Sequence, residues 1–256
     1  MIANYHTHTP RCNHGSGADE EFVQEALRVG LKVLGFADHT PQFYPEGHYS
    51  SIRMRPDQLQ GYVESLESLK KQYAGQLKIH IGLETEYYPA YFPELISFLR
   101  DANIEYLLLG QHYCGNEIGE VYNGNRIDDE NHLKRFVHQV ADAMQTGLFT
   151  YVAHPDFMDF VGDPKAYETH MRWLCREAKA NAMPLELNTF GWLCDMCFPQ
   201  DRFWRIAAEE GNSVIIGSDA HDPEDVCLPE MAEKAEQFAK DLGLNLLETV
   251  DLRPIR

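Results

Sequence analysis

The stretch Val-Leu-Gly-Phe-Ala-Asp-His-Thr, residues 33–40, carries the pattern that decides the fold. Its apolar part has the length of a buried strand, and an aspartate and a histidine follow directly. A segment with helix signals ends before it at Gly30, and another begins after it at Pro56 and Asp57. The stretch therefore predicts a strand between two helices, with polar side chains at the point where the strand ends.

The same pattern recurs along the chain. Apolar runs of strand length lie at Ile2–Tyr5, Val33–Ala37, Leu77–Leu83, Ile104–Leu109, Phe149–Ala153, Leu185–Leu187 and Ser213–Gly217. Segments with helix caps separate them, so the chain alternates strand and helix, which predicts a parallel α/β sheet. Seven units favour a closed barrel with helices outside, and an open sheet is compatible with the same pattern. In both architectures the ligand site forms at the carboxyl ends of the strands.

Composition sets the broad class of the protein. The chain has 256 residues, 44% of them hydrophobic, and no linker or internal repeat divides it, so residues 1–256 are expected to form a single domain. A formal charge of −18 argues against nucleic acid and anionic membranes as partners. Six scattered cysteines and the lack of a secretory signal predict a cytoplasmic protein. The sequence does not indicate the oligomeric state.

Histidines gather at the predicted strand ends. Seven of the twelve lie there together with two carboxylates, and the set is His6, His8, His14, His39, Glu84, His112, His154, Asp219 and His221. A single histidine is more often a hydrogen-bonded structural residue, but the predicted fold brings these nine to one rim. Imidazoles and carboxylates are good ligands for Zn, Mn and Fe. Nine such ligands suit three divalent ions.

The motifs that contain these residues resemble the PHP family (polymerase and histidinol phosphatase). They are Tyr-His-Thr-His at 5–8, Phe-Ala-Asp-His at 36–39, Gly-Leu-Glu at 82–84, Gln-His at 111–112, Ala-His-Pro at 153–155 and Ser-Asp-Ala-His at 218–221. The resemblance implies a distorted (β/α)7 barrel that carries a trinuclear metal centre. One ion would be held by His6, His8, Glu84 and Asp219, a second by Glu84, His112 and His154, and a third by His14, His39 and His221. Cys-Asn-His-Gly-Ser-Gly at 12–17 and Phe-Ala-Asp-His-Thr-Pro at 36–41 look most like the histidinol-phosphate phosphatase branch.

The resemblance implies a metal-dependent phosphomonoesterase, with L-histidinol phosphate as the first candidate substrate and histidine biosynthesis as the role. Glu84, His154 and Asp219 are the expected catalytic residues, because they would hold the ions that activate a hydroxide for attack on phosphorus. Asp38 and Asp156 are expected to orient neighbouring ligands.

Arginines in the predicted loops are candidates for binding the phosphate. Arg11, Arg53 and Arg126 follow the first, second and fourth strands, and a solvated surface position is an equal alternative for each. The branch carries phosphate-binding arginines after its fifth and sixth strands, where this chain has residues 157–160 and 190–193 without a basic side chain. This departure weakens the assignment of the substrate.

Two other functions are compatible with the sequence. One is a PHP-family phosphoesterase acting on another small phosphomonoester or a nucleotide, and the other is a non-catalytic metal-binding module, which the complete ligand set disfavours. Cys194 and Cys197 have the CxxC spacing but lack a second pair, so packing or oxidation sensitivity is expected there rather than a zinc finger.

Overall fold

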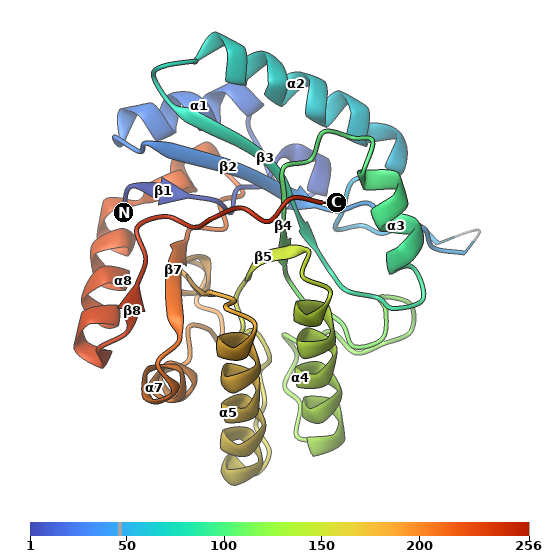
Figure 1. Cartoon of the computed structure of the whole chain (residues 1–256), viewed down its shortest axis with the longest axis vertical. Helices are drawn as coiled ribbons and strands as arrows, with labels where there is room; N and C mark the ends of the chain where they lie inside the picture. The colour runs from blue at the N-terminus through green and yellow to red at the C-terminus, as the bar shows by residue number, and fades with distance from the viewer. Residues whose placement is uncertain (46–47, 256) are drawn as a thin grey trace.

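The computed structural model describes residues 1–45 and 48–255. Eight parallel strands form one sheet whose spatial order follows the sequence (Figure 1). The strands are β1 (Ala3–Asn4), β2 (Val33–His39), β3 (Lys78–Thr85), β4 (Tyr106–Leu109), β5 (Phe149–Val152), β6 (Leu185–Asn188), β7 (Ser213–Gly217) and β8 (Asn245–Leu246). All seven predicted strands are present. The eighth has only two residues, both exposed, so no apolar run announces it.

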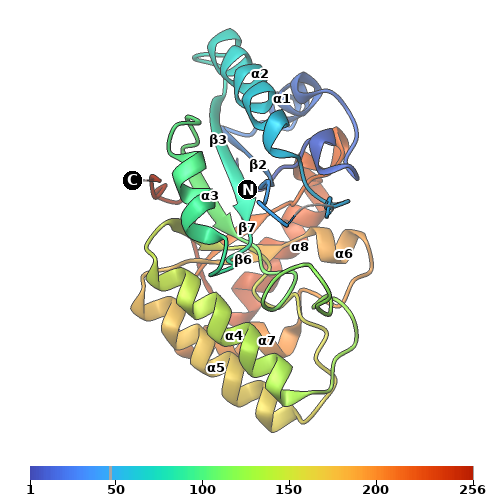
Figure 2. The same ribbon diagram turned by 90° about the vertical axis from the view of Figure 1, so that its right-hand side faces the viewer.

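Helices surround the sheet on its outer side (Figures 1 and 2). They are α1 (Asp19–Arg28), α2 (Leu59–Gln72), α3 (Phe92–Leu99), α4 (Glu130–Gln145), α5 (Pro164–Ala180), α6 (Phe190–Leu193), α7 (Asp201–Glu210) and α8 (Pro229–Leu242), with short 3-10 helices at Pro10–Cys12, Pro56–Gln58 and Pro223–Cys227. Each long helix buries one apolar face on the strands, and α4 packs along α5. In the described part of the chain, no helix has the length and apolarity needed to cross a membrane.

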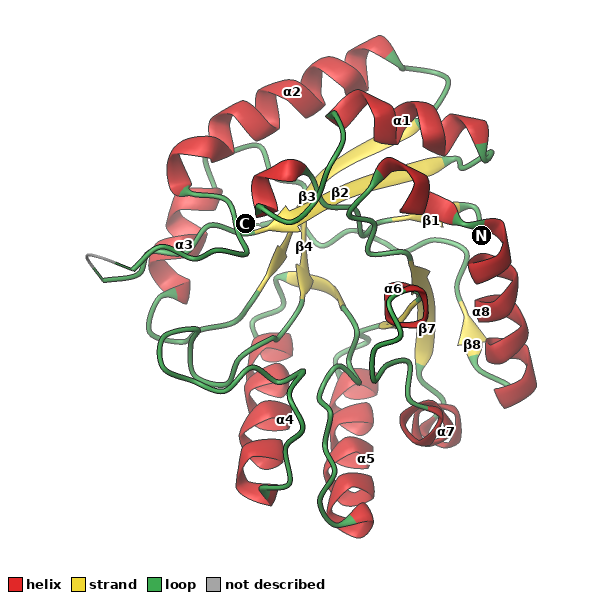
Figure 3. Cartoon of the chain, turned by 180° about the vertical axis from the view of Figure 1, so that it is seen from behind, coloured by secondary structure: helices red, strands yellow, loops and turns green. Residues whose placement is uncertain are grey.

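The curved sheet closes at the carboxyl ends of its strands. Thr7, just after β1, forms a parallel bridge with Ala220, just after β7. His8 donates its backbone N–H to the Ala220 carbonyl at 2.8 Å, and Ala220 donates to the His6 carbonyl at 3.2 Å. At the opposite end β7 pairs with β8 instead. The predicted distorted α/β barrel is therefore confirmed, and Figure 3 shows from behind how the helices enclose the curled strands.

Three tyrosines, Tyr5, Tyr106 and Tyr151, lie among the small and aliphatic residues that pack inside the barrel. Tyr106 donates its hydroxyl hydrogen to the carbonyls of Tyr5 and Phe36, at 2.7 and 3.0 Å. Its ring fits because the neighbouring strands carry glycine: a Cβ atom at Gly35 or Gly82 would lie 2.3 or 2.4 Å from Tyr106. The segment after β8 packs against this interior through Leu247, Val250 and Leu252. In Figure 1 this segment is the red loop that runs across the sheet to the C-terminus. The barrel is thus covered at one end and carries its polar cluster at the other.

Candidate metal centre

The structure brings the nine predicted ligands together at the carboxyl ends of the strands. Eight of them fall in groups whose nitrogen and oxygen atoms lie within 4.8 Å of one another: His6, His8 and Asp219; His6, Glu84 and His154; His8, His39 and Glu84; and His14, His39 and His221. The ninth, His112, places Nε2 3.8 Å from a Glu84 oxygen. Strand pairing explains part of this arrangement, since His39 stands opposite Glu84 in the register of β2 and β3.

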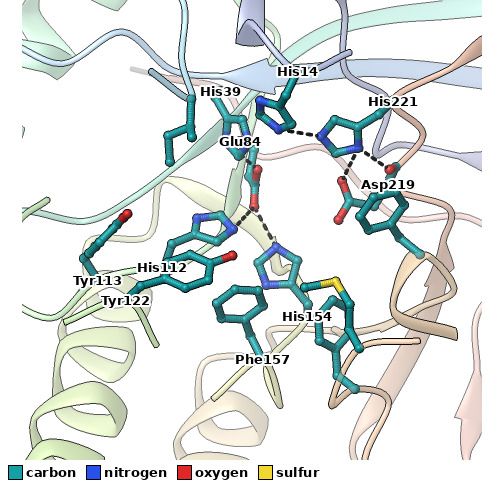
Figure 4. Close-up of a pocket in the computed structure, with 14 residues that line it drawn as sticks. His14, His39, Glu84, His112, Tyr113, Tyr122, His154, Phe157, Asp219 and His221 are labelled. Atoms are coloured by element: carbon teal, nitrogen blue, oxygen red, sulfur yellow. Dashed lines mark hydrogen bonds and ion pairs between the residues drawn. The ribbon is translucent and has the colours of Figure 1, made fainter. Parts of the chain in front are cut away.

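Glu84 lies at the centre of the cluster (Figure 4). One of its oxygens is 2.8 Å from His154 Nε2, and the other is 2.9 Å from His39 Nδ1 and 3.6 Å from the Nε2 atoms of both His6 and His8. The carboxylate has room because the neighbouring strand is followed by Gly110, where a Cβ atom would lie 1.8 Å from a Glu84 oxygen. A carboxylate surrounded in this way can bridge two cations.

Asp219 and the first two histidines form the next group. Asp219 Oδ1 lies 2.9 Å from His8 Nε2 and 3.3 Å from His6 Nε2, yet it is buried without a hydrogen bond of acceptable geometry. The two Nε2 atoms are themselves 3.2 Å apart. Buried polar atoms are normally satisfied, so three such atoms pointing at one another fit a shared cation.

His14 and His221 provide a sharper test of whether these residues fit a metal. His14 Nδ1 lies 2.8 Å from the Cys12 carbonyl, and His221 Nδ1 lies 2.9 Å from the Asp219 carbonyl. A carbonyl only accepts, so both Nδ1 atoms carry hydrogen, and each neutral ring then has its lone pair on Nε2. These two Nε2 atoms face each other at 2.9 Å, as Figure 4 shows. Facing lone pairs repel unless a cation lies between them, so the donor set fits a divalent metal.

The pKa shifts of the clustered residues agree with a site for cations. Burial lowers the pKa of His221 to about 3, with nearby His8 adding to the effect, and burial also lowers the pKa of His14. His8 is buried as well, but its contacts with Asp219 and Asp38 outweigh burial and raise its pKa to about 9. Despite burial, nearby histidines hold the pKa of both Glu84 and Asp219 well below the usual range. The carboxylates are therefore ionised, and the cluster favours positive charge beside them.

Carboxylates behind the cluster hold several imidazole rings from their far side. His6 Nδ1 lies 2.9 Å from Glu186, His112 Nδ1 lies 3.2 Å from Glu86, and His8 Nδ1 lies 3.6 Å from Asp38. Metal-binding histidines commonly direct their second nitrogen to such a partner. The Asp38 contact is beyond hydrogen-bond distance, and His8 Nδ1 has no hydrogen-bond partner, so the orienting role of Asp38 stays a prediction. Asp156 does not orient His154, because its carboxylate accepts from the Gln200 N–H and Trp204 Nε1, and His154 Nδ1 has no hydrogen-bond partner.

Glu186 on β6 is a site residue that the sequence reasoning missed. Besides His6, it accepts hydrogen bonds from the His154 N–H at 3.1 Å and from the Tyr151 hydroxyl at 3.1 Å. The His154 backbone has φ of 30°, a conformation that is costly for a residue with a side chain and that the Glu186 contact helps to hold. A Cβ atom at Gly217 would lie 2.0 Å from a Glu186 oxygen, so this glycine makes space for the carboxylate. One signal was available, since Leu-Glu-Leu-Asn places a charged residue inside a buried strand.

The cluster forms the floor of a cavity of about 320 Å³. Seven predicted ligands line it: His14, His39, Glu84, His112, His154, Asp219 and His221. The other lining residues carry no formal charge, and they are Ile52, Tyr113, Tyr122, Phe157, Phe190, Met196 and Phe198. The cavity therefore has an ionisable floor and an uncharged, largely aromatic wall.

None of the three predicted arginines lines this cavity. Arg11 forms an ion pair with Asp19 at 2.8 Å on another face of the barrel. Arg53 is buried, with its guanidinium 2.7 Å from Glu86 and 2.9 Å from Glu117. Arg126 is exposed. The carboxylates already occupy the hydrogen-bonding fork of Arg11 and much of that of Arg53, so the structure gives a phosphate-binding role for these arginines no support.

The similar proteins include several histidinol-phosphatases. The chain is 28% identical to a probable histidinol-phosphatase of Deinococcus radiodurans over 88% of both chains, and 27% identical to a histidinol-phosphatase of Bacillus subtilis over 86% of this chain and 94% of that one. Among solved structures, the histidinol phosphate phosphatase of Lactococcus lactis subsp. lactis, complexed with zinc, L-histidinol and phosphate, has a TM-score of 0.73 at 19% identity, covering 98% of both chains.

The family assignment rests on the sequence itself. Residues 4–190 match the profile of the PHP domain, and this range contains seven of the nine clustered residues. Asp219 and His221 lie beyond the matched range, but the fold returns them to the same cluster. The carboxyl end of the α/β barrel thus holds residues that fit divalent metals. Since the match spans most of the sequence, this chain belongs to the PHP domain family.

Proposed function

We propose that this chain is a metal-dependent phosphomonoesterase that hydrolyses L-histidinol phosphate to L-histidinol and phosphate. The observation that carries the proposal is the cluster itself, in which two ionised carboxylates and five histidines form the floor of a cavity of about 320 Å³. A cavity of this size suits a small ester. The names of the relatives from Deinococcus radiodurans and Bacillus subtilis support the choice of substrate.

The proposed metal centre holds three divalent ions of Zn, Mn or Fe. His6, His8, Glu84 and Asp219 would hold the first, Glu84, His112 and His154 the second, and His14, His39 and His221 the third. Divalent ions supply Lewis-acid stabilisation of phosphoryl oxygens and lower the pKa of water. One Glu84 oxygen lies 2.8 Å from His154 Nε2, and the other lies 3.6 Å from the Nε2 atoms of His6 and His8, which supports its assignment as the bridging ligand.

The protein side chains have defined parts in this proposal. Glu84, His154 and Asp219 form the catalytic set, because they line the cavity and would hold the ions that activate a hydroxide. Glu186 positions His6 and His154 from behind. No arginine or lysine lines the cavity among the residues described, so the charge of a bound phosphate must be balanced by the ions of the cluster. A cytoplasmic location also belongs to the proposal.

Phosphate release from L-histidinol phosphate tests the proposal directly. The protein is loaded with Mn or Zn, and the same preparation is measured after chelation and again after the metal is restored. We expect a kcat/KM of about 10⁴ M⁻¹s⁻¹ or more, lost on chelation and recovered on reloading. Full activity in protein shown to contain no metal would overturn the mechanism. Slow, metal-dependent turnover would direct attention to a different small phosphomonoester.

A further inference from the structure

The wall of the cavity differs in chemistry from its floor. Five of the lining residues outside the cluster are aromatic: Tyr113, Tyr122, Phe157, Phe190 and Phe198. Lysine, arginine and any carboxylate other than Glu84 and Asp219 are missing from the lining, as far as the described residues 1–45 and 48–255 extend. Both of these carboxylates face histidines of the cluster. The part of a substrate that projects from the floor therefore meets aromatic rings and no free side-chain charge.

The rings stand directly beside the histidines on two parts of the cluster. Phe157 packs edge-on against His112 with centroids 4.9 Å apart, and Tyr122 packs edge-on against Phe157 at 5.3 Å (Figure 4). Phe190 lies beside His221 at 4.9 Å. A phosphoryl group on the floor would thus place its ester substituent among ring faces and edges.

The wall is held in place by the fold. Phe157 is 3% exposed and Phe198 is 2% exposed, and their rings contact each other at 5.5 Å. The backbone N–H of Phe157 donates to the His154 carbonyl at 2.9 Å, which ties this part of the wall to a clustered histidine. A preformed aromatic surface binds a planar group without a large cost in side-chain ordering.

These contacts favour one class of ester. A neutral or cationic planar ring gains from stacking and from the negative faces of the aromatic rings. A second anionic group finds no cation, and an isolated ammonium group finds no free carboxylate among the described lining residues. The described lining residues therefore offer no ion pair to the ammonium group of an amino substituent.

We propose that this wall is a ring-binding subsite that selects phosphomonoesters carrying a neutral or cationic planar ring, whether or not they carry an amino group. The inference rests on the proposed phosphomonoesterase function and narrows it. For L-histidinol phosphate, the imidazole ring is recognised and the amine is not. Esters with an additional carboxylate or phosphate are poor substrates.

Two analogues of L-histidinol phosphate separate these contributions. The phosphate of 3-(imidazol-4-yl)propan-1-ol lacks only the amine, and the phosphate of alaninol keeps the amine but lacks the ring. We expect kcat/KM for the first to stay within about threefold of L-histidinol phosphate, and that for the second to fall at least about tenfold. A loss of tenfold or more with the analogue that lacks the amine, or equal turnover of the one that lacks the ring, would overturn the subsite.

Substitutions in the aromatic wall test whether it causes the preference for esters that carry a ring. In Phe190→Leu and Tyr122→Leu, the ratio of kcat/KM between ring and ringless esters should fall about threefold or more, mainly through KM for the ring ester. The matched control is Phe98→Leu in α3, whose ring packs on Phe43 away from the cavity and which should preserve the ratio. Metal content is measured for every variant. An intact ratio in both wall variants at normal metal content would contradict the proposal.

A complete failure of phosphomonoester hydrolysis is distinguishable from a failure of the subsite. If none of the esters is hydrolysed by loaded protein, the proposed function is wrong, and the subsite is then tested with benzyl alcohol alone by ligand-observed NMR. Saturable binding that Phe190→Leu weakens would support a ring-binding wall without phosphatase chemistry. Absence of such binding would overturn the wall as well.

Discussion

At the scale of single residues, the cluster depends on histidines whose side chains point to one another and to two carboxylates. His154 Nε2 lies 2.8 Å from Glu84, and its Nδ1 atom has no hydrogen-bond partner, so the polar contacts of this side chain go to the cluster. Replacing His154 with alanine should lower kcat by at least about 10²-fold while leaving the far-UV circular dichroism unchanged. His170→Ala is the matched control, because His170 pairs with Glu130 on the outer surface. Near-normal turnover in His154→Ala would remove this residue from the catalytic set.

Glu186 should act through the residues that it holds. In Glu186→Gln the side chain keeps its size but loses its charge beside His6 Nδ1, so the ring is less basic and less firmly oriented. We expect metal affinity to fall about 10- to 100-fold, measured by competition with a chromophoric chelator. Gly217→Ala should weaken metal binding in the same direction, because a Cβ atom there would displace the Glu186 carboxylate. Unchanged affinity in both variants would reduce Glu186 to a buried structural residue.

Glu105 gives a pH dependence that is independent of the cluster. Burial opposes ionisation, but hydrogen bonds from His80, Lys70 and the Ile81 N–H lower the pKa of this carboxyl to about 2. A pKa lowered by folding stabilises the protein above the unfolded value of about 4.3, and this contribution is lost as the pH falls toward 2.

The expected result for Glu105→Gln is a loss of about 1–2 kcal/mol in the free energy of unfolding at pH 7. The difference from the parent protein should shrink as the pH falls to 3, as measured by urea denaturation. Glu233→Gln on the exposed side of α8 is the control and should show little effect at either pH. A difference that stays constant with pH would contradict the role of the charge.

The residues of the site were predictable to different degrees. The nine clustered residues could be found because each follows an apolar run, and parallel strands bring such positions to one rim. The arginines could not be placed by this argument, because it locates a residue in a loop but does not reveal its partner. Arg53 illustrates the gap, since its carboxylate partners come from the loops after β3 and β4.

At the scale of elements, β1 to β7 and the long helices were predictable, whereas α6 and β8 were not. Apolar runs mark β2 to β7, and prolines or aspartates mark the starts of α4, α5 and α8. The four-residue helix α6 and the two-residue strand β8 have too few residues to show a period. The segment after β8 was missed for the same reason, although it covers the amino end of the barrel.

This covering segment has a testable contribution to stability. Val250 and Leu252 pack against the barrel interior, and Arg253 donates hydrogen bonds to the Thr150 hydroxyl and the Asn181 carbonyl. The double change Val250→Ser and Leu252→Ser should lower the free energy of unfolding by about 1–3 kcal/mol and Tm by several degrees. Glu248→Ser, an exposed position in the same segment, is the control. Calorimetry showing equal Tm values for the two variants would exclude the covering role.

At the scale of the whole molecule, the clustered residues come from segments that lie far apart in the sequence. His6 and His8 follow β1, whereas Asp219 follows β7, and the barrel closes between these two segments. Binding of ions should therefore stabilise the entire fold, by about 2.7 kcal/mol for each site at a metal concentration of 100 Kd.

Chelation followed by thermal denaturation measures this stabilisation. We expect Tm to fall when the metal is removed and to recover with Mn or Zn. Added metal should raise the Tm of Asp219→Asn by less than that of the parent protein, because this variant lacks the Asp219 carboxylate that faces His6 and His8. A Tm that does not respond to metal in the parent protein would show that the cluster binds ions too weakly to stabilise the fold.

The bridge between the segments after β1 and β7 also determines when the cluster can form during synthesis of the protein. The Thr7–Ala220 bridge joins residues that leave the ribosome more than 200 positions apart. His6 and His8 are made before Asp219 and His221, so the cluster cannot assemble until β7 and the residues that follow it have been translated. A nascent chain that stalls before β7 therefore has the first two histidines of the cluster but lacks the carboxylate that they face in the folded protein.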